Sequence, residues 1–102
     1  MIQPYVEVGN NCILWSGNHV GHRTIIQDHV FVASHAVISG YCIIGEGSFL
    51  GVNSTFNDNV SIAPSCIIGS GSLVVKNTEP EGIYVGSPAR RVPRKSSFDV
   101  EL

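Results

Sequence analysis

The chain has 102 residues, a formal net charge of −2 and 14% charged residues. A single domain of this length has a small core, so association with further copies is a natural way to bury more apolar surface. The composition lacks the excess of basic residues that is typical of proteins binding nucleic acids or membrane surfaces. No apolar run approaches the roughly 18 residues of a membrane span. Because no signal-peptide pattern follows Met1, we expect a cytoplasmic protein that binds neither nucleic acid nor membrane.

From residue 2 onward an aliphatic or aromatic residue recurs at every sixth position. The residue two positions earlier is usually small or β-branched, and the residue directly after is often small, which suits a sharp corner. A period of six with two inward positions is typical of short strands joined by corners, three to a turn. We therefore predict an all-β fold, a left-handed parallel β-helix of about four triangular coils over residues 1–75. The recurring residues are Ile2, Val8, Leu14, Val20, Ile26, Val32, Ile38, Ile44, Leu50, Phe56, Ile62, Ile68 and Val74.

Residues 18 positions apart stack one above the other in such a coil, so the corner residues form three edges that run along the helix axis. These edges decide which polar residues can share a site. The first edge carries Pro4, His22, Gly40 and Asp58, the second Asn10, Asp28, Glu46 and Pro64, and the third Ser16, Ser34, Val52 and Ser70.

The outward residues on the flat faces of the coil include a continuous apolar stripe, which predicts an oligomer. Such a stripe is too large for a small monomer to leave exposed to solvent, so we expect a homotrimer whose second edge points to the threefold axis. The first edge of one subunit then meets the third edge of the next in three equivalent clefts, lined by His22 and Gly40 of one chain and by Ser34, Val52 and Ser70 of its neighbour. The interface residues are Ile13, Phe31, Phe49 and Ile67 on one face, and Ile25 and Ile43 on the next.

Cys12, Cys42 and Cys66 all fall on the small inward position of the hexad, where cysteine is a compact core residue. Cys12 and Cys66 share a column but lie three coils apart, roughly 14 Å at strand spacing, which is too far for a disulfide bond. We therefore expect structural thiols, and no metal or redox site.

The repeat separates the four histidines. His22 lies on a corner next to Gly40 of the following coil, where a bare backbone lets a ligand approach closely. A free imidazole titrates near pH ~6.5 and can accept a proton at neutral pH, so His22 is the candidate base, with a solvated corner histidine as the alternative. His19 lies mid-face beside the same cleft and is a weaker candidate for substrate contact. We expect His29 to pair across subunits and His35 to line the neighbour's side of the cleft.

The hexad pattern stops after Val75. Residues 76–92 form a C-terminal extension of loop and strand with a Val-Gly-Ser-Pro-Ala segment, and residues 93–102 form a polar tail in which Pro93 disfavours a continuing helix. The basic run RRVPRK is more typical of a solvated tail than of a nucleic-acid site.

The repeat over residues 2–75 resembles that of the hexapeptide-repeat acyltransferases. The runs HRTIIQDHVFVASHAVISGYCIIGEGSFLG and IIGSGSLVVKNTEPEGIYVGSPARRV are similar to the sialic acid O-acetyltransferases and the bacillosamine-type sugar N-acetyltransferases. Those enzymes carry a histidine four residues before an inward aliphatic residue, as His22 precedes Ile26, and a terminal V-G-[NS]-P-A segment.

The resemblance implies an acetyl-CoA-dependent acetyltransferase that acts on a hydroxyl or amine of a small, sugar-type acceptor. His22 would be the general base, the Gly40 N–H would bind the thioester carbonyl, and no protein nucleophile would be needed. The resemblance also implies that main-chain groups at Val52 and Ser70 contact the pantetheine arm, with Ser34 in the same cofactor groove. Lys76 and Arg90 are assigned to the CoA phosphates on charge alone, and His19 and Arg23 are weaker candidates for contact with the acceptor.

Two features differ from that family. Arg23 follows His22 where those enzymes commonly carry an acidic residue, and the chain begins at the first coil without their N-terminal nucleotide-sugar domain. We therefore expect the acceptor to be held by the coils alone or by a separate domain.

Two further classes of function stay open. One is a non-catalytic trimeric β-helix module. The other is a zinc protein similar to γ-class carbonic anhydrases, in which nitrogen ligands converge about 2.0–2.1 Å from the metal. Those proteins place two of their histidines five residues apart, a spacing that His19, His22, His29 and His35 do not reproduce.

Overall fold

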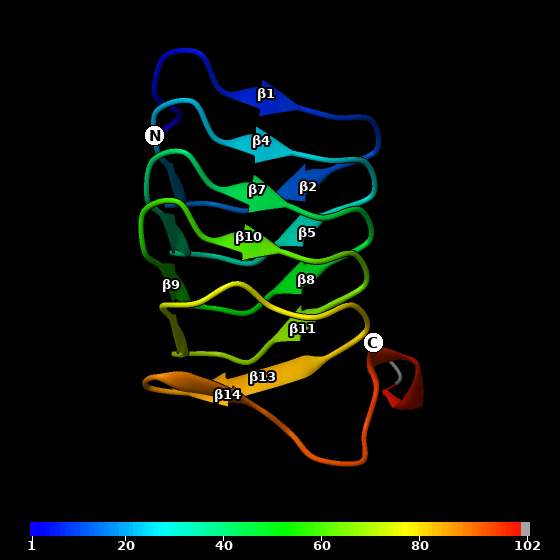
Figure 1. Cartoon of the computed structure of the whole chain (residues 1–102). Coiled ribbons are helices and arrows are strands. Elements are labelled where there is room, and N and C mark those ends of the chain that lie inside the picture. Colours follow the sequence, from blue (N-terminus) through cyan, green and yellow to red (C-terminus); the bar gives the residue numbers. More distant parts are fainter. Residues whose placement is uncertain (101–102) are drawn as a thin grey trace.

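The computed structural model describes residues 1–100. Twelve strands of two residues each, one per hexad, are followed by a longer pair of strands and one 3₁₀ turn, η1. Figure 1 shows the coils stacked along one axis, with β1 in the first coil and the β13–β14 pair at the other end. The elements are β1 Glu7–Val8, β2 Ile13–Leu14, β3 His19–Val20, β4 Ile25–Ile26, β5 Phe31–Val32, β6 Val37–Ile38, β7 Ile43–Ile44, β8 Phe49–Leu50, β9 Thr55–Phe56, β10 Ser61–Ile62, β11 Ile67–Ile68, β12 Leu73–Val74, β13 Ile83–Gly86, β14 Ala89–Arg91 and η1 Ser97–Asp99.

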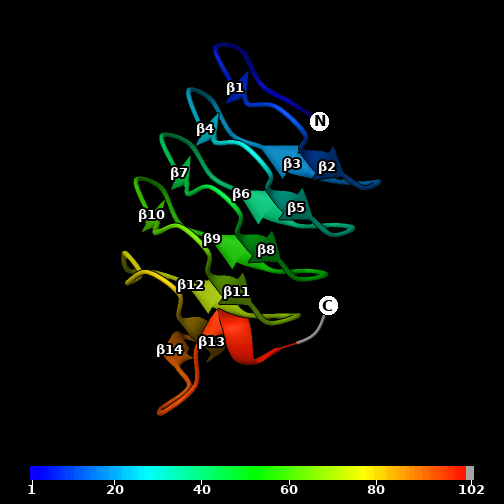
Figure 2. The same cartoon turned by 90° about the vertical axis from the view of Figure 1, so that its right-hand side faces the viewer.

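Each short strand pairs in parallel with the strand one coil further on, as Ile25 of β4 does with Ile43 of β7. The pairs build three sheets, β1-β4-β7-β10, β3-β6-β9-β12 and β2-β5-β8-β11, and the last of these continues through β13 into β14. Figures 1 and 2 show these sheets as the sides of the β-helix. The predicted all-β fold, a left-handed parallel β-helix of about four triangular coils, is confirmed.

The hexad residues form the core. Those from Val20 to Val74 are at most 2% exposed, and the small residues two positions before them line the rest of the interior. Three interior hydroxyls donate to backbone carbonyls, for example from Thr24 Oγ1 to Ser39 O at 3.0 Å. Asn18 is the one bulkier polar residue at these small inward positions, and its side-chain amide forms hydrogen bonds with the backbone of Trp15 and of Ala36. These interior polar side chains are therefore hydrogen-bonded within the chain.

The three cysteines are free and occupy the inward positions that the repeat predicts. Cys42 and Cys66 are buried, and Cys12 in the first coil is half-buried. Burial raises the pKa of the Cys42 thiol. Each thiol lies near a backbone carbonyl, such as Asn57 O at 3.2 Å from Cys42 Sγ.

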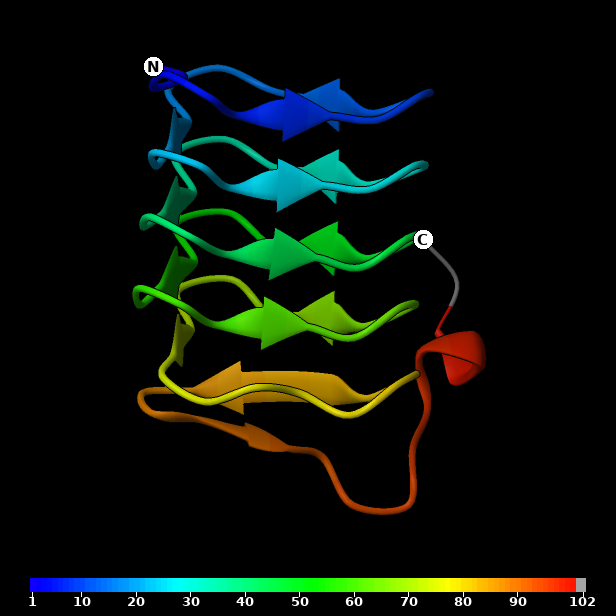
Figure 3. The ribbon, with the colours of Figure 1, turned by 45° about the horizontal axis from the view of Figure 1, so that its top comes forward.

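The two ends of the β-helix differ. At the N-terminal end the core positions Ile2 and Val8 are 57% and 41% exposed, because no coil stacks on them. At the other end the antiparallel β13–β14 hairpin folds across the last coil, and Tyr84 and Ala89 pack against the core. Figure 3 shows the hairpin lying under the coils. The extension thus closes the C-terminal end of the interior.

The chain after β14 returns to the second edge. The Ser97 N–H donates to Glu81 O at 2.8 Å, and Phe98 of η1 faces a hollow of about 290 Å³ that Gly47 and Ser65 also line. Figure 1 shows η1 beside the corners of the later coils. Of the predicted polar tail 93–102, residues 101 and 102 lie outside the described residues. Within residues 1–100 no helix is long and apolar enough to cross a membrane.

Candidate active site

The backbone of His22 is fixed by both neighbouring coils. His22 is half-buried at the corner between β3 and β4. Its N–H donates to Gln3 Oε1 at 2.8 Å, and its carbonyl accepts the Tyr41 N–H at 2.9 Å. The candidate base therefore stands on a rigid corner, as the repeat predicts.

The His22 imidazole lies between two tyrosine rings. Its centroid is 5.8 Å from that of Tyr5 in the preceding coil and 5.8 Å from that of Tyr41 in the following coil, with interplanar angles of 88° and 68°. The Arg23 guanidinium lies over the Tyr5 ring, 4.6 Å from its centroid. Sequence reasoning missed both tyrosines because it followed only the first residue of each corner, although the spacing of 18 would have aligned Tyr5, Arg23 and Tyr41.

Gly40 adjoins His22 on the first edge, as predicted, but its backbone N–H already has a hydrogen-bond acceptor. The Gly40 N–H donates to Asp58 Oδ1 at 2.9 Å. The same contact occurs on the second edge, where the Asn10 N–H donates to Asp28 Oδ1 at 2.7 Å. Asp58 is exposed, so its side chain can rotate away and release the amide.

Packing constrains position 40 less than position 21. A Cβ at position 40 would lie 3.3 Å from the His22 carbonyl oxygen, a close contact, and 3.7 Å from Asp58 Oδ1, an ordinary one. At Gly21, by contrast, a Cβ would lie 2.6 Å from the Gly40 nitrogen. The bare backbone at position 40 therefore leaves room beside His22, and the fold depends on it less than on Gly21.

The predicted residues of the third edge lie on one column of the same chain, away from the first edge. Ser34 is half-buried, and Val52 and Ser70 are exposed. One chain does not bring them to His22, and the cleft that the sequence predicts needs a second copy. The half-buried His19 lies on β3, on the face between the third and first edges.

The other two histidines lie elsewhere. His29 is on the second edge, where its Nδ1 is 2.9 Å from Asn11 Nδ2 of the same chain. The His35 ring occupies the space beside Gly17 on the third edge. Among residues 1–100 no group of three His, Cys, Asp or Glu side chains is placed to hold a metal ion.

The two predicted phosphate-binding cations meet in one cavity. Lys76 and Arg90 both line a cavity of about 300 Å³ at the C-terminal end, together with Arg91, which sequence reasoning did not single out. Lys76 lies two residues after the end of β12, and Arg90 lies in β14. Three cations around one cavity suit an anionic group such as a phosphate.

The apolar stripe is present on the predicted face. Phe31 and Phe49 stack with centroids 4.9 Å apart, and Trp15 packs on Phe31 at 5.9 Å. Ile13 and Ile43 are 50% and 41% exposed.

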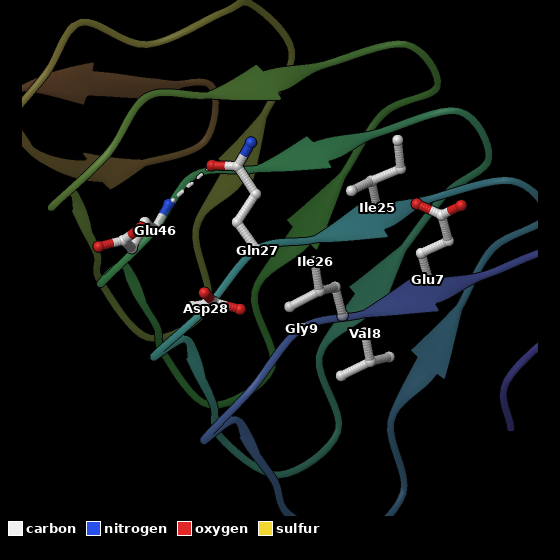
Figure 4. Close-up of a pocket in the computed structure, with 8 residues that line it drawn as sticks. All are labelled: Glu7, Val8, Gly9, Ile25, Ile26, Gln27, Asp28 and Glu46. Carbon is white, nitrogen blue, oxygen red and sulfur yellow. Dashed lines mark hydrogen bonds between the residues drawn. The ribbon is translucent and has the colours of Figure 1, made fainter.

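A separate groove of about 470 Å³ lies across β1 and β4, toward the second edge (Figure 4). Its walls include Ile25, and Asp28 and Glu46 stand on its rim, where the Gln27 side chain accepts the Glu46 N–H at 3.1 Å. None of the predicted catalytic or CoA-binding residues lines it.

Comparison with protein families matches the bacterial transferase hexapeptide repeat model at residues 2–40 and 41–76. Serine acetyltransferase 2 of Arabidopsis thaliana is 28% identical over 111 residues, which are 99% of this chain and 34% of that protein. The mitochondrial γ carbonic anhydrase 2 of Arabidopsis thaliana is 38% identical over 69 residues, which are 66% of this chain and 24% of that protein. The chain thus spans about a third or less of the length of these relatives.

Solved structures agree with the fold. Soybean serine acetyltransferase superposes with a TM-score of 0.85 at 28% identity, over 89% of this chain and 42% of that one. PerB of Caulobacter crescentus, solved with CoA and GDP-perosamine, superposes with a TM-score of 0.72 at 23% identity, over 90% of this chain and 53% of that one.

Proposed function

Because the chain belongs to the bacterial transferase hexapeptide family, we propose that it is an acetyl-CoA-dependent acetyltransferase acting on a hydroxyl or amine of a small, sugar-type acceptor. The observation that carries this proposal is Gly40 beside His22. The backbone at Gly40 is not left-handed and an added Cβ would crowd only the His22 carbonyl oxygen, so the open space fits a ligand at the candidate base.

His22 takes the proton from the acceptor hydroxyl or amine as that atom attacks the thioester carbonyl carbon. The Gly40 N–H, once Asp58 releases it, donates to the carbonyl oxygen as negative charge develops there. The acetyl group passes directly to the acceptor, the thiolate of CoA leaves, and no protein nucleophile takes part.

The fit of acetyl-CoA to the chain is supported at both ends of the first edge. The thioester would lie at His22 and Gly40, and the phosphates would lie in the cavity formed by Lys76, Arg90 and Arg91. At about 4.8 Å per coil the two ends are roughly 14 Å apart, a span suited to the extended pantetheine arm. Ser34, Val52 and Ser70 of a neighbouring subunit would line the other wall.

The second wall requires a homotrimer, which the exposed stripe around Phe31, Phe49 and Trp15 supports. Since η1 lies beside Gly47 and Ser65 on the second edge, the contacts at the threefold axis in the later coils would be made with η1 included. Light scattering should give three times the mass of the 10.9 kDa chain, and a monomer at micromolar concentration would contradict this assembly.

The second candidate is a zinc protein, which the match to a γ carbonic anhydrase favours. Against it, no two of His19, His22, His29 and His35 are five residues apart, and His29 lies on the second edge, away from the cleft. Metal analysis of the purified protein separates the two, since the acetyltransferase needs no zinc.

The deciding experiment has two readouts. Acetyl-CoA should raise the melting temperature of the protein, and thiol release from acetyl-CoA should depend on an added amino-sugar or sugar acceptor. A matched panel with serine as acceptor tests the substrate class of the plant relatives. Folded trimer that neither binds acetyl-CoA nor releases CoA would instead be the non-catalytic module.

A further inference from the structure

The second residue of each corner has a left-handed backbone. In every coil this position has φ between about 56° and 74°, a region where bulky side chains are uncommon. Asn or Gly occupies it at residues 11, 17, 47, 53, 59 and 71, and Arg23, His29, His35 and Ser65 occupy it elsewhere. Tyrosine occupies it only at Tyr5 (φ 62°) and Tyr41 (φ 61°), in the coils directly before and after His22. The fold would be served at least as well by asparagine at both positions.

Core packing does not explain these rings either. Tyr5 is 71% exposed and Tyr41 is 54% exposed. What the two side chains share is their edge-on contact with the His22 imidazole, one from each side. Two aromatic residues in an unfavourable backbone region therefore converge on the one candidate base.

The contacts with the two tyrosine rings restrict the orientation of the His22 ring, and general-base catalysis depends on that orientation. The side-chain torsion that turns an imidazole ring has a broad, roughly two-fold preference, so an unsupported histidine presents its nitrogen lone pair in many directions. Efficient proton transfer requires a fixed direction toward the acceptor. Aromatic rings prefer edge-to-face geometry at the distances found here, so a ring on each side restricts the rotation.

We infer that Tyr5 and Tyr41 are positioning residues that hold the His22 ring in the orientation that accepts the acceptor's proton. The inference rests on the proposed function of His22 as the base. The residue after His22 is Arg23, and its guanidinium is held over the Tyr5 face at 4.6 Å, so Tyr5 also fixes where that positive charge lies. The two rings thus do the orienting that a carboxylate does for many catalytic histidines.

The test replaces the rings without disturbing the corners. Tyr5→Asn, Tyr41→Asn and the double variant install the residue that this corner already carries at Asn11, Asn53 and Asn59, so folding should be retained. Tyr5→Phe and Tyr41→Phe keep the rings. Asn59→Gly is the matched control, because it alters the same corner position one coil beyond Tyr41 and suits the same φ.

In the double Asn variant kcat should fall roughly tenfold while the KM for acetyl-CoA stays within about twofold, since the loss is of orientation and not of donor binding. The Phe variants should keep most of the wild-type kcat. Independently of turnover, the ring-current shifts of the His22 imidazole protons in NMR spectra should move toward free-histidine values in the Asn variants and stay unchanged in Asn59→Gly.

The outcomes separate the two proposals. An active enzyme whose double Asn variant keeps its kcat would overturn the positioning role, whatever the NMR shifts do, and so would a loss seen equally in the Phe variants. Wild-type protein that transfers no acetyl group to any acceptor would overturn the proposed function and, with it, the catalytic role of the rings, even with the NMR signature intact.

Discussion

The first and second edges are built by the same repeat and differ in what they carry. On each, an aspartate accepts the backbone N–H of the corner residue in the preceding coil, Asp58 from Gly40 and Asp28 from Asn10. Yet the first edge places a histidine between two tyrosine rings, whereas the second carries Glu46 and lies beside η1. The backbone contact is therefore common to both edges, and the two tyrosine rings around His22 distinguish the first edge.

The largest difference between the edges should come from their histidines. His22→Ala should lower kcat roughly a thousandfold, because general-base catalysis contributes about 10²–10⁴, while acetyl-CoA still raises the melting temperature. His29→Ala on the second edge should leave kcat unchanged. Steady-state kinetics with the trimer verified by light scattering checks both variants, and near wild-type turnover in His22→Ala would show that another group is the base.

The next comparison concerns the two corner amides. Gly40→Ala should cost roughly a hundredfold in kcat/KM, because its Cβ would occupy the space beside His22 and keep the thioester oxygen away from the position 40 N–H. Asn10→Ala, at the equivalent place on the second edge, should have no effect on turnover. Melting temperatures of the two variants should lie close together. If Gly40→Ala is as active as the wild type, the thioester does not use the open space beside the His22 corner.

A smaller effect should separate the two aspartates. Because Asp58 holds the Gly40 amide, Asp58→Ala should raise kcat/KM by roughly two- to tenfold, the range of one net hydrogen bond. Asp28→Ala should cost the same stability, at most about 1 kcal/mol, and leave activity alone. Denaturant unfolding and kinetics on both variants test this, and a fall in activity for Asp58→Ala would assign the carboxylate a direct role in the site.

The sequence predicts most of the fold because each coil repeats the last. A period of six predicts the buried series of inward residues from Val20 to Val74. It also predicts the place of His22 beside Gly40 and the inward position of the cysteines. The Asp58 contact on Gly40 could not be foreseen, because a side-chain rotation leaves no trace in the periodicity. The β13–β14 hairpin and the return of η1 to the second edge lie beyond the repeat, where packing against the last coil decides the path.

The smallest effect should distinguish the cysteines that follow the two edges. Cys42 comes after the first edge and is buried, and its pKa is raised by that burial, whereas Cys12 comes after the second edge in the uncovered first coil and is half-buried. The thiolate is the reactive form, so a disulfide reagent at pH 8 should label Cys12 well before Cys42. Mass spectrometry of peptides after timed quenching gives the order.

The burial of the Cys42 thiol also makes the free energy of unfolding depend on pH. Because the folded pKa of Cys42 lies above that of the unfolded thiol, roughly 8.5, the native state keeps a proton that the unfolded chain releases. This contribution to the free energy of unfolding is fully present below the unfolded pKa and is lost as the pH rises through the folded pKa. A Cys42→Ala variant should therefore show a shallower loss of stability than a Cys12→Ala variant as the pH rises above about 8.5. Equal slopes for the two variants would mean that burial does not raise the pKa of the Cys42 thiol and that the interior at this coil admits water.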